Sequence, residues 1–250
     1  MVRVTIVQLE VLDEPEKSME HAINNIIKAC TAESEIICLP EQWYPSEILN
    51  IEEELSAIID ISSDQGICII PGAFIERVDD ERYISTPVID NGKIIGKQYK
   101  IHPFATEKDK VKAGNKLHIF NYKGIKFGIA ICHDIVFPEI SRALTLKGSD
   151  IIFYPSKIHN EGIEPWHIYA QARALENRVV TIAPNVCNDI YGGRSIIVDI
   201  MYDKFVDVAK PDLVQASAYE QILVSDIDIE KIRAIREIRL RELRDDYSSL

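Results

Sequence analysis

Residues 128–139 read GIAICHDIVFPE, and this stretch joins an apolar run to a segment suited to begin a helix. The run ends at Cys132, and Pro138, a residue favoured at the first position of a helix, follows six residues later. The chain must therefore turn just after Cys132, which places the sulfur at the edge of a sheet. Unpaired backbone N–H groups at such a turn stabilise negative charge on sulfur or on an attacked carbonyl oxygen. From this stretch alone, Cys132 is either a nucleophile or a buried core cysteine.

The composition bounds the class of protein. The chain has 250 residues, 46% of them hydrophobic, so we expect a sizeable core and a single domain over residues 1–250. The formal net charge of -12, without a basic block, argues against a nucleic-acid partner. The five cysteines form no CxxC pair and no disulfide framework, which indicates reduced thiols in a cytoplasmic protein. No signal-peptide pattern and no apolar run of membrane-spanning length occurs, so we expect no membrane partner.

Helical and extended patterns alternate along the chain, which is typical of an α/β protein. We expect helices over residues 16–32, 51–62, 140–147 and 166–178, and a solvated helix in the charged run 231–246. We expect strands over residues 3–9, 35–39, 67–70, 83–90, 93–99, 117–122, 125–131, 151–154, 179–183, 195–200, 201–208 and 220–227. Because hairpin signals at Asn91-Gly92 and Lys123-Gly124 interrupt the alternation, the sheets should be mixed.

Three chemically active side chains each follow an apolar strand. Glu41 comes just after strand 35–39, Lys100 just after strand 93–99, and Cys132 ends the opening stretch. Taken singly, Glu41 fits a capping or surface carboxylate and Lys100 fits an edge charge. If the strands are neighbours, however, the three groups project from one edge. This set suits acyl transfer, because a carboxylate takes the thiol proton, an ammonium stabilises the oxyanion and the sulfur forms a thioester.

The segments around these residues resemble the carbon-nitrogen hydrolases of the nitrilase superfamily, in particular its amidase-like branch, which use a Glu-Lys-Cys triad. The matching segments are LPEQW around Glu41, KQYKIHPF around Lys100 and CHDIVFPE at Cys132, with ARALENRVVTIAPN (172–185) and GGRSIIVD (192–199) in support. The resemblance implies a four-layer α-β-β-α sandwich with two mixed β-sheets. It also implies catalysis without a metal or other cofactor, and a homodimer or higher homo-oligomer.

The resemblance further implies roles for single residues. Glu41 would be the general base and Cys132 the nucleophile, while Lys100 and the backbone N–H of His133 would stabilise the tetrahedral intermediate. Glu107, which otherwise fits a solvated acid in a charged segment, would orient Lys100 or the attacked group. Ammonia would leave first, and a water activated by Glu41 would then hydrolyse the thioester.

Three departures from the family bear on the substrate. His133 stands where many amidases carry Tyr or Trp, so its ring either borders the substrate or is merely packed. Asp134, in place of the Glu in the Cys-Trp-Glu of true nitrilases, favours amides over nitriles; we expect its side chain to hold the turn by hydrogen bonds. The segment after Pro155 lacks the usual Trp, and the sequence does not place two candidates for binding a substrate carboxylate, Lys157 and Arg194.

We therefore expect an amidase that acts on a small linear amide or N-carbamoyl compound through a thioester on Cys132. One alternative is nitrile hydrolysis by the same triad, and another is a catalytically silent binding or scaffold protein. A third is a metal site built from Cys132, His133, Asp134 and His102.

Overall fold

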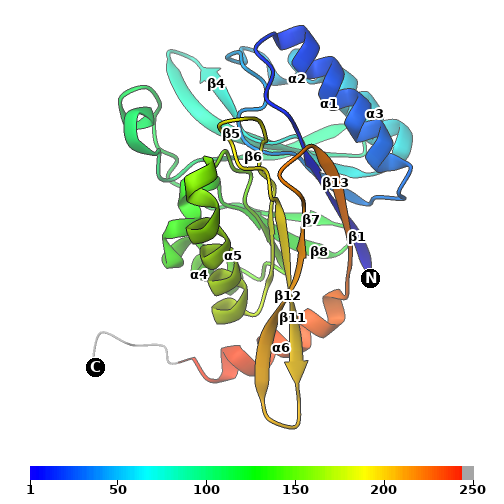
Figure 1. The fold of residues 1–250 in the computed structure, drawn as a ribbon, viewed down its shortest axis with the longest axis vertical. Coiled ribbons are helices and arrows are strands. Elements are labelled where there is room, and N and C mark those ends of the chain that lie inside the picture. Colours follow the sequence, from blue (N-terminus) through cyan, green and yellow to red (C-terminus); the bar gives the residue numbers. More distant parts are fainter. Residues whose placement is uncertain (244–250) are drawn as a thin grey trace.

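The computed structural model describes residues 1–243, which form two mixed β-sheets packed face to face with helices outside them (Figure 1). The first sheet has the strand order β13-β1-β2-β3-β5-β4, with β6 paired to β5, and the second has the order β12-β11-β10-β9-β8-β7. The strands are β1 (Val2–Gln8), β2 (Ile36–Cys38), β3 (Cys68–Ile70), β4 (Phe74–Val78), β5 (Glu81–Asp90), β6 (Lys93–Tyr99), β7 (Ile119–Tyr122), β8 (Ile125–Ile129), β9 (Ile151–Phe153), β10 (Val180–Ala183), β11 (Ile196–Asp203), β12 (Val208–Gln215) and β13 (Gln221–Ile227). The helices are α1 (Pro15–Cys30), α2 (Ile51–Glu54), α3 (Ser56–Gln65), α4 (Pro138–Leu146), α5 (Ile163–Asn177) and α6 (Ile229–Arg241), with short 3₁₀ turns η1 (Ala105–Asp109), η2 (Cys132–Val136) and η3 (Asn160–Gly162).

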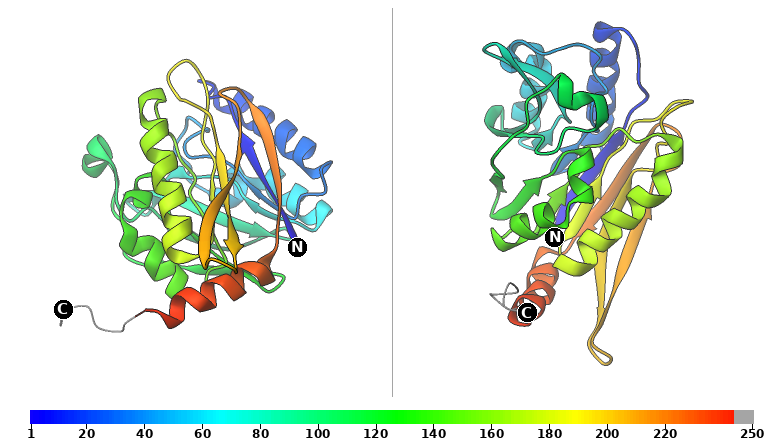
Figure 2. Two further views of the ribbon diagram at one scale, coloured as in Figure 1. Left: turned by 60° about the horizontal axis from the view of Figure 1, so that its bottom comes forward. Right: turned by 90° about the vertical axis from the view of Figure 1, so that its left-hand side faces the viewer.

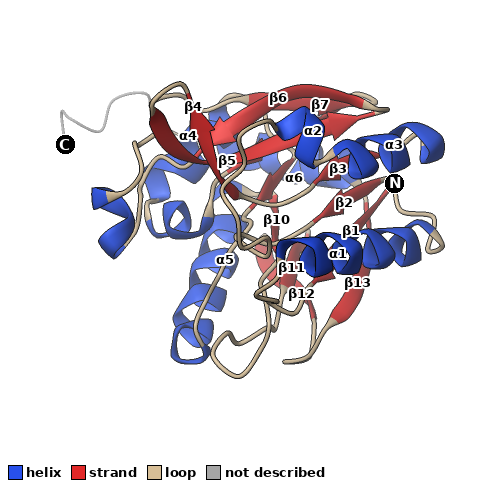
Figure 3. Cartoon of the chain, turned by 90° about the horizontal axis from the view of Figure 1, so that it is seen from above, coloured by secondary structure: helices blue, strands red, loops and turns tan. Residues whose placement is uncertain are grey.

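The layers follow from the period-two alternation of apolar side chains on the strands. In β2, Ile36 and Cys38 join the core between the sheets, whereas Ile37 faces outward into a second core that includes Ala22 and Ile26 of α1. Figure 3 shows the strands in the middle, between α1 and α3 on one side and α4 and α5 on the other. The prediction of a four-layer α-β-β-α sandwich with two mixed sheets is confirmed.

The hairpin turns agree with their sequence signals. Both Asn91-Gly92 and Lys123-Gly124 have positive φ at each residue, 46° and 76° in the first pair and 49° and 83° in the second. Such turns suit the right-handed twist of the strands that they join.

The second predicted helix is in fact two helices. The pattern predicted one helix over residues 51–62, but α2 ends at Glu54 and α3 begins at Ser56. Leu55 departs from helical geometry with φ -100° and ψ 14° and is fully buried. The buried Leu55 therefore stands at the break between the two helices.

Two strands were missed in sequence, and both lie at sheet edges. β4 pairs with β5 alone, and its residues Phe74–Val78 follow a Pro-Gly pair that indicates a turn. The predicted strand 201–208 is wrong, because β11 continues to Asp203 and the chain turns before β12 begins at Val208. β12 contains Pro211, which an edge strand tolerates because one side of its backbone has no partner strand.

Helix α6 lies across the lower ends of the sheets in Figures 1 and 2. The prediction that the charged run is solvated is wrong for one face, since Ile232 and Ile235 are buried and Arg236 is only 8% exposed. The last part of that run, residues 244–246, lies outside the described residues. Among residues 1–243, no helix is both long enough and apolar enough to cross a membrane. The single domain over residues 1–250 stays a prediction.

Candidate active site

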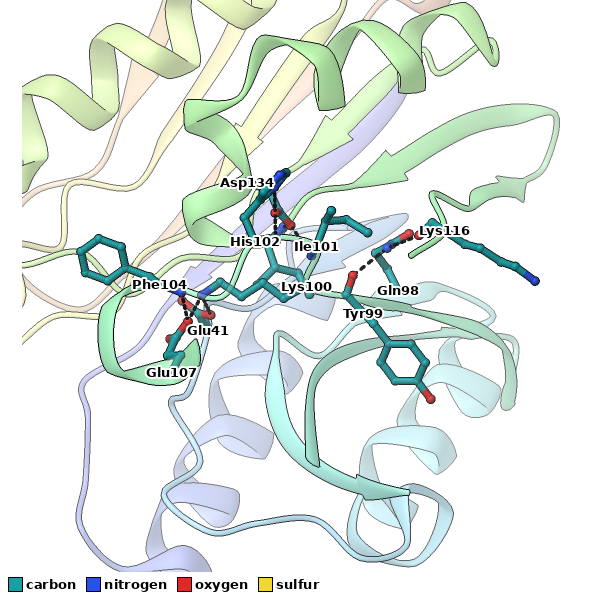
Figure 4. Close-up of polar contacts among 11 residues, drawn as sticks. Glu41, Gln98, Tyr99, Lys100, Ile101, His102, Phe104, Glu107, Lys116 and Asp134 are labelled. Atoms are coloured by element: carbon teal, nitrogen blue, oxygen red, sulfur yellow. Dashed lines mark hydrogen bonds and ion pairs between the residues drawn. The ribbon is translucent and has the colours of Figure 1, made fainter. Parts of the chain in front are cut away.

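The three side chains at strand ends come together at one edge of the sandwich. Glu41 follows β2 and Lys100 follows β6, both from the first sheet, whereas Cys132 follows β8 of the second sheet. Figure 4 shows the side chains of Glu41, Lys100 and Glu107 pointing toward one another. The site thus draws on both sheets, and the strand-end reasoning placed its members correctly.

A buried ion cluster forms the centre of the site; we call Glu41, Lys100 and Glu107 the site cluster. Lys100 Nζ lies 2.9 Å from Glu41 Oε1 and 2.9 Å from Glu107 Oε2. The side chains of Lys100 and Glu41 are 1% and 2% exposed, and that of Glu107 is 24% exposed. Ions this deep in a protein require partners, so the ammonium and the two carboxylates stabilise one another. Glu107 is therefore a partner of Lys100 and not a solvated acid.

Glu107 is itself held in place by its local turn. Its Oε2 accepts a hydrogen bond of 2.6 Å from the backbone N–H of Phe104, at the start of η1. Ala105, within the same turn, has a positive φ of 45°. This compact turn aims the carboxylate back at Lys100.

Cys132 occupies a sharp turn between β8 and η2. Its φ is 48°, a left-handed value that costs free energy in residues other than glycine and that is found at functional sites. Its backbone N–H donates to the Pro155 carbonyl at 2.9 Å, which links it to the segment after β9. The thiol lies close enough to the Glu41 carboxylate and to the backbone N–H of Lys157 for both groups to affect its pKa. Cys132 as a whole residue is only 9% exposed, so this turn is largely shielded from solvent.

The environment sets the proton affinities of the three groups. Burial raises the pKa of Glu41 above that of an ordinary carboxyl, although the charge of Lys100 opposes the rise. Burial, followed by the charge of Glu41, raises the pKa of the Cys132 thiol, against the opposing charge of Lys100. Burial lowers the pKa of Lys100, but the charges of Glu41, Cys132 and Glu107 outweigh this effect and leave it raised. The site therefore combines a protonated thiol, a carboxylate of increased basicity and a permanently charged ammonium.

Asp134 links the backbone on both sides of the site, as Figure 4 shows. Its fully buried carboxylate accepts the backbone N–H groups of Ile131 at 3.0 Å, Ile101 at 3.2 Å and His102 at 2.8 Å, and its Oδ1 lies 2.9 Å from His102 Nδ1. We call these contacts the Asp134 clamp. Ile101 directly follows Lys100 and Ile131 directly precedes Cys132, so one carboxylate fixes the spacing between the ammonium and the sulfur. The sequence predicted its role in the turn but not its reach to the other sheet.

A second support holds the end of β6. The side-chain amide of Gln98, which is 1% exposed, donates to the carbonyls of Tyr99 and Lys116, each at 2.8 Å (Figure 4). Its Oε1 accepts the backbone N–H of His118 at 3.0 Å. Gln98 therefore fixes the end of β6 immediately before Lys100.

His133 is half-buried among aromatic rings. Its ring centroid lies 4.9 Å from that of Phe104 and 5.4 Å from that of Phe137, beside a hollow that Lys108 also lines. Burial, followed by the charge of Lys100, lowers the pKa of His133 and so favours the neutral ring. A contact between His133 and the substrate stays a prediction.

The two candidates for carboxylate binding are placed very differently. Lys157 lies at the site: its Nζ is 3.3 Å from the carbonyl of Gln42, the neighbour of Glu41, and 4.8 Å from the centre of the Tyr191 ring. Arg194 instead contacts the Gly192 carbonyl at 3.5 Å, and its own carbonyl lies 2.7 Å from His167 Nε2. Lys157 follows the end of β9 by four residues, and the structure thus places a residue that the sequence named but did not locate.

The residues of the suggested metal site are engaged with other partners. His102 pairs with Asp134, and the Cys132 thiol faces Glu41. Within residues 1–243, no group of three His, Cys, Asp or Glu side chains is arranged to hold a metal ion. All five cysteines lie in this range and are free thiols, as the sequence predicted.

Comparison with known proteins supports these observations. Residues 3–237 match the family model described as carbon-nitrogen hydrolase. A nitrilase of Pyrococcus abyssi is 29% identical over 99% of this chain and 96% of that protein, and the omega-amidase NIT2 of Xenopus tropicalis is 25% identical over 98% and 96%. The crystal structure of a carbon-nitrogen hydrolase from Helicobacter pylori G27 superposes with a TM-score of 0.86 at 22% identity, over 99% of this chain and 97% of that one. This last likeness concerns the fold alone.

Proposed function

Because the chain belongs to the carbon-nitrogen hydrolase family, we propose that it is an amidase that cleaves the C–N bond of a small linear amide or N-carbamoyl compound and releases ammonia. The single observation that supports this most strongly is the position of Lys100, 2.9 Å from both Glu41 and Glu107, with Glu41 close enough to the Cys132 thiol to affect its pKa. A nucleophile, a base and a cation are thus within reach of one carbonyl group.

In the first half-reaction, the Cys132 sulfur attacks the amide carbon while its proton passes to Glu41. The raised pKa of Glu41 favours this transfer, since a stronger base takes the proton of a weakly acidic thiol more readily. Lys100 and the backbone N–H of His133 stabilise the oxyanion. Glu41 then returns the proton to the leaving nitrogen, which departs as ammonia and leaves a thioester on Cys132.

In the second half-reaction, a water molecule attacks the thioester and gives its proton to Glu41. The tetrahedral intermediate collapses, the carboxylic acid leaves, and the sulfur regains the proton from Glu41. Glu41 thus accepts a proton and returns it in each half, and Lys100 stays charged throughout because its pKa is raised. Glu107 positions the ammonium for both steps.

The burial of the site supports a small substrate. Glu41 and Lys100 are each 1% exposed and Cys132 is 9% exposed, so only a slender group reaches the sulfur. A primary amide at the end of a short chain meets this requirement, whereas a folded protein or a polymer does not.

Nitrile hydrolysis is the second candidate, and the relative named nitrilase, at 29% identity, favours it. Attack of the same sulfur on a nitrile carbon gives a thioimidate, which water converts to the thioester and ammonia. A catalytically silent binding or scaffold role is the remaining alternative.

The proposal is tested by an ammonia-release screen over ω-amides, N-carbamoyl amino acids, aliphatic amides and nitriles, with the native protein and the Cys132→Ala variant. We expect release from amides, a loss of at least about 10⁴-fold in the variant, and an acyl adduct on Cys132 by intact-mass spectrometry. Undiminished turnover in the variant would overturn the mechanism. Absence of any turnover or adduct in the native protein would favour the silent alternative.

We also propose that the chain forms a homodimer or a higher homo-oligomer. The edge strand β12 and the end of β11 carry apolar side chains exposed to solvent, including Met201, Val208, Leu213 and Val214, which are 51%, 41%, 44% and 38% exposed. Apolar groups gathered along a sheet edge are typical of a surface that associates. Light scattering coupled to size-exclusion chromatography measures this directly, and a monomer at micromolar concentration would contradict it.

A further inference from the structure

Lys157 places a second ammonium at the site, in surroundings quite unlike those of Lys100. The Lys100 ammonium lies between two carboxylates, whereas Lys157 Nζ contacts the carbonyl oxygen of Gln42 at 3.3 Å and the face of the Tyr191 ring at 4.8 Å. Within residues 1–243, no carboxylate lies within ion-pairing distance of Lys157. A carbonyl and an aromatic face stabilise a cation only in part, so this ammonium retains the capacity to bind an anion.

The position of Lys157 is fixed on the side of the nucleophile. Lys157 lies two residues beyond Pro155, whose carbonyl accepts the Cys132 N–H at 2.9 Å, and directly after Ser156, whose carbonyl accepts the Glu41 N–H at 3.2 Å. Backbone contacts therefore hold this residue against the reacting sulfur, while its side chain extends toward Gln42 and Tyr191. One lysine side chain thus spans the distance between the reacting centre and the ammonium.

The electrostatic balance supports an anionic ligand. Burial lowers the pKa of Lys157, and only the more distant charge of Glu41 opposes this effect. A half-buried ammonium without a close counter-ion is destabilised by the loss of hydration, and a bound carboxylate would offset that loss through a charge-assisted hydrogen bond.

We propose that Lys157 binds a carboxylate of the substrate and so determines specificity for short amides that carry an acid group at the other end, such as the monoamides of small dicarboxylic acids. This inference rests on the proposed amidase function and deepens it. Because a single lysine side chain bridges the sulfur and the ammonium, the amide carbon and the carboxylate are separated by only a few carbon atoms. Longer or neutral amides gain nothing from Lys157.

The test compares matched pairs of substrates, succinamate with butanamide and glutaramate with pentanamide, in which a methyl group replaces the carboxylate. We expect the native protein to favour the acid in each pair, and Lys157→Met to lower kcat/KM for the acid by about 10- to 100-fold, mainly through KM, the usual range for a hydrogen bond to a charged group. Butanamide should change by less than about threefold, because it has no group for the ammonium to bind. Lys157→Arg should restore part of the preference, whereas Lys110→Met, which removes an exposed charge, should leave it intact.

Two results would overturn the inference while leaving the amidase proposal in place. The first is a native protein that hydrolyses neutral amides as well as their acidic partners. The second is an equal loss on both members of a pair in Lys157→Met, which would assign Lys157 a general effect on the site and not specificity. If no amide releases ammonia, the proposed function itself fails, and calorimetry with succinate then tests Lys157 alone: binding weakened at least about tenfold in Lys157→Met supports the inference, and unchanged binding overturns it.

Discussion

The protein contains two ion clusters of inverse composition, one with two acids and one base and the other with one acid and two bases. The site cluster pairs Glu41 and Glu107 with Lys100, whereas a second cluster, which we call the anchor cluster, pairs Asp150 with Arg233 and Arg236 of α6. The side chains of Glu41 and Asp150 are 2% and 1% exposed, and the shortest ion-pair distances of these two carboxylates are 2.9 and 2.8 Å. Burial and distance alone therefore do not distinguish them.

The clusters differ in the number of hydrogen bonds that the carboxylates of Asp150 and Glu41 accept. Asp150 accepts two from Arg233, at 3.1 and 2.8 Å, one from Arg236 at 2.8 Å, and one from the Lys126 backbone N–H at 3.1 Å. Glu41 accepts one, from Lys100 at 2.9 Å. One carboxylate has a donor on every side, and the other retains free acceptor capacity.

The pKa values shift in opposite directions as a result. Burial raises the pKa of Asp150, but the hydrogen bonds from Arg233 and Arg236 outweigh it and the net pKa lies below that of an ordinary aspartate. At Glu41 the effect of burial prevails, and the pKa is raised. A carboxylate surrounded by donors stabilises the fold, while one with few donors keeps the proton affinity that a general base needs.

The largest expected effect is that of Glu41→Gln on catalysis. Removal of the proposed base should lower kcat by about 10²- to 10⁴-fold, whereas the free energy of unfolding should not fall, because Lys100 keeps Glu107 as a partner and a costly buried charge is removed. Ammonia release and urea denaturation measure the two quantities. Glu139→Gln, an exposed acid in the first turn of α4, is the matched control and should retain full activity. A large loss of stability in Glu41→Gln would show that the site cluster also holds the fold.

The pH dependence of stability, compared between the native protein and Glu41→Gln, tests the raised pKa of Glu41. Because the folded-state pKa of Glu41 is raised, its favourable contribution to stability is present below the unfolded value of about 4.3 and is lost as pH rises through the folded value. The stability of Glu41→Gln relative to the native protein should therefore increase over that interval. The acidic limb of kcat/KM in the native protein should also lie above about pH 4.3. A limb at the ordinary carboxyl value would contradict the raised pKa.

A smaller effect, on stability alone, is expected from Asp150→Asn. The change leaves the buried Arg236 guanidinium without its carboxylate partner, while the more exposed Arg233 keeps Glu230, and it should lower the free energy of unfolding by about 3 kcal/mol, with kcat unchanged at temperatures where the variant is folded. Asp226→Asn is the matched surface control: Asp226 accepts two hydrogen bonds from Arg3 but is 46% exposed, and its loss should cost less than about 1 kcal/mol.

The dependence of stability on acid pH distinguishes Asp150 from Glu41. The folded-state pKa of Asp150 is lowered, so its contribution is fully present above the unfolded value of about 3.9 and is lost as pH falls through the folded value. The stability difference between the native protein and Asp150→Asn should therefore shrink below about pH 3.9. A difference that persists at lower pH would assign the effect of Asp150→Asn to packing and not to charge.

The sequence predicted those parts of the site that follow from strand ends. Apolar runs mark the strands, and a functional side chain directly after such a run must emerge at an edge of a sheet, which located Glu41, Lys100 and Cys132. The family resemblance added Glu107, which its charged surroundings concealed.

The contacts between the two sheets were beyond the sequence, because they join residues far apart in the chain. The Asp134 clamp joins positions 32 and 33 residues apart, and the anchor cluster joins Asp150 to residues more than 80 positions away. Local pattern also failed where tertiary context prevails: a buried Leu55 separates α2 from α3, and an edge position lets β12 contain Pro211.

The division of the site between the sheets also affects the chain before folding is complete. The first sheet supplies Glu41 and Lys100, the second supplies Cys132, and the Asp134 clamp forms only when the two sheets are docked. A nascent chain in which only one sheet has formed therefore has either the Glu41 carboxylate without the Cys132 thiol or the thiol without the carboxylate. Under the proposed mechanism, hydrolysis requires the assembled sandwich, so ammonia release from a suitable amide would report native docking of the two halves during refolding.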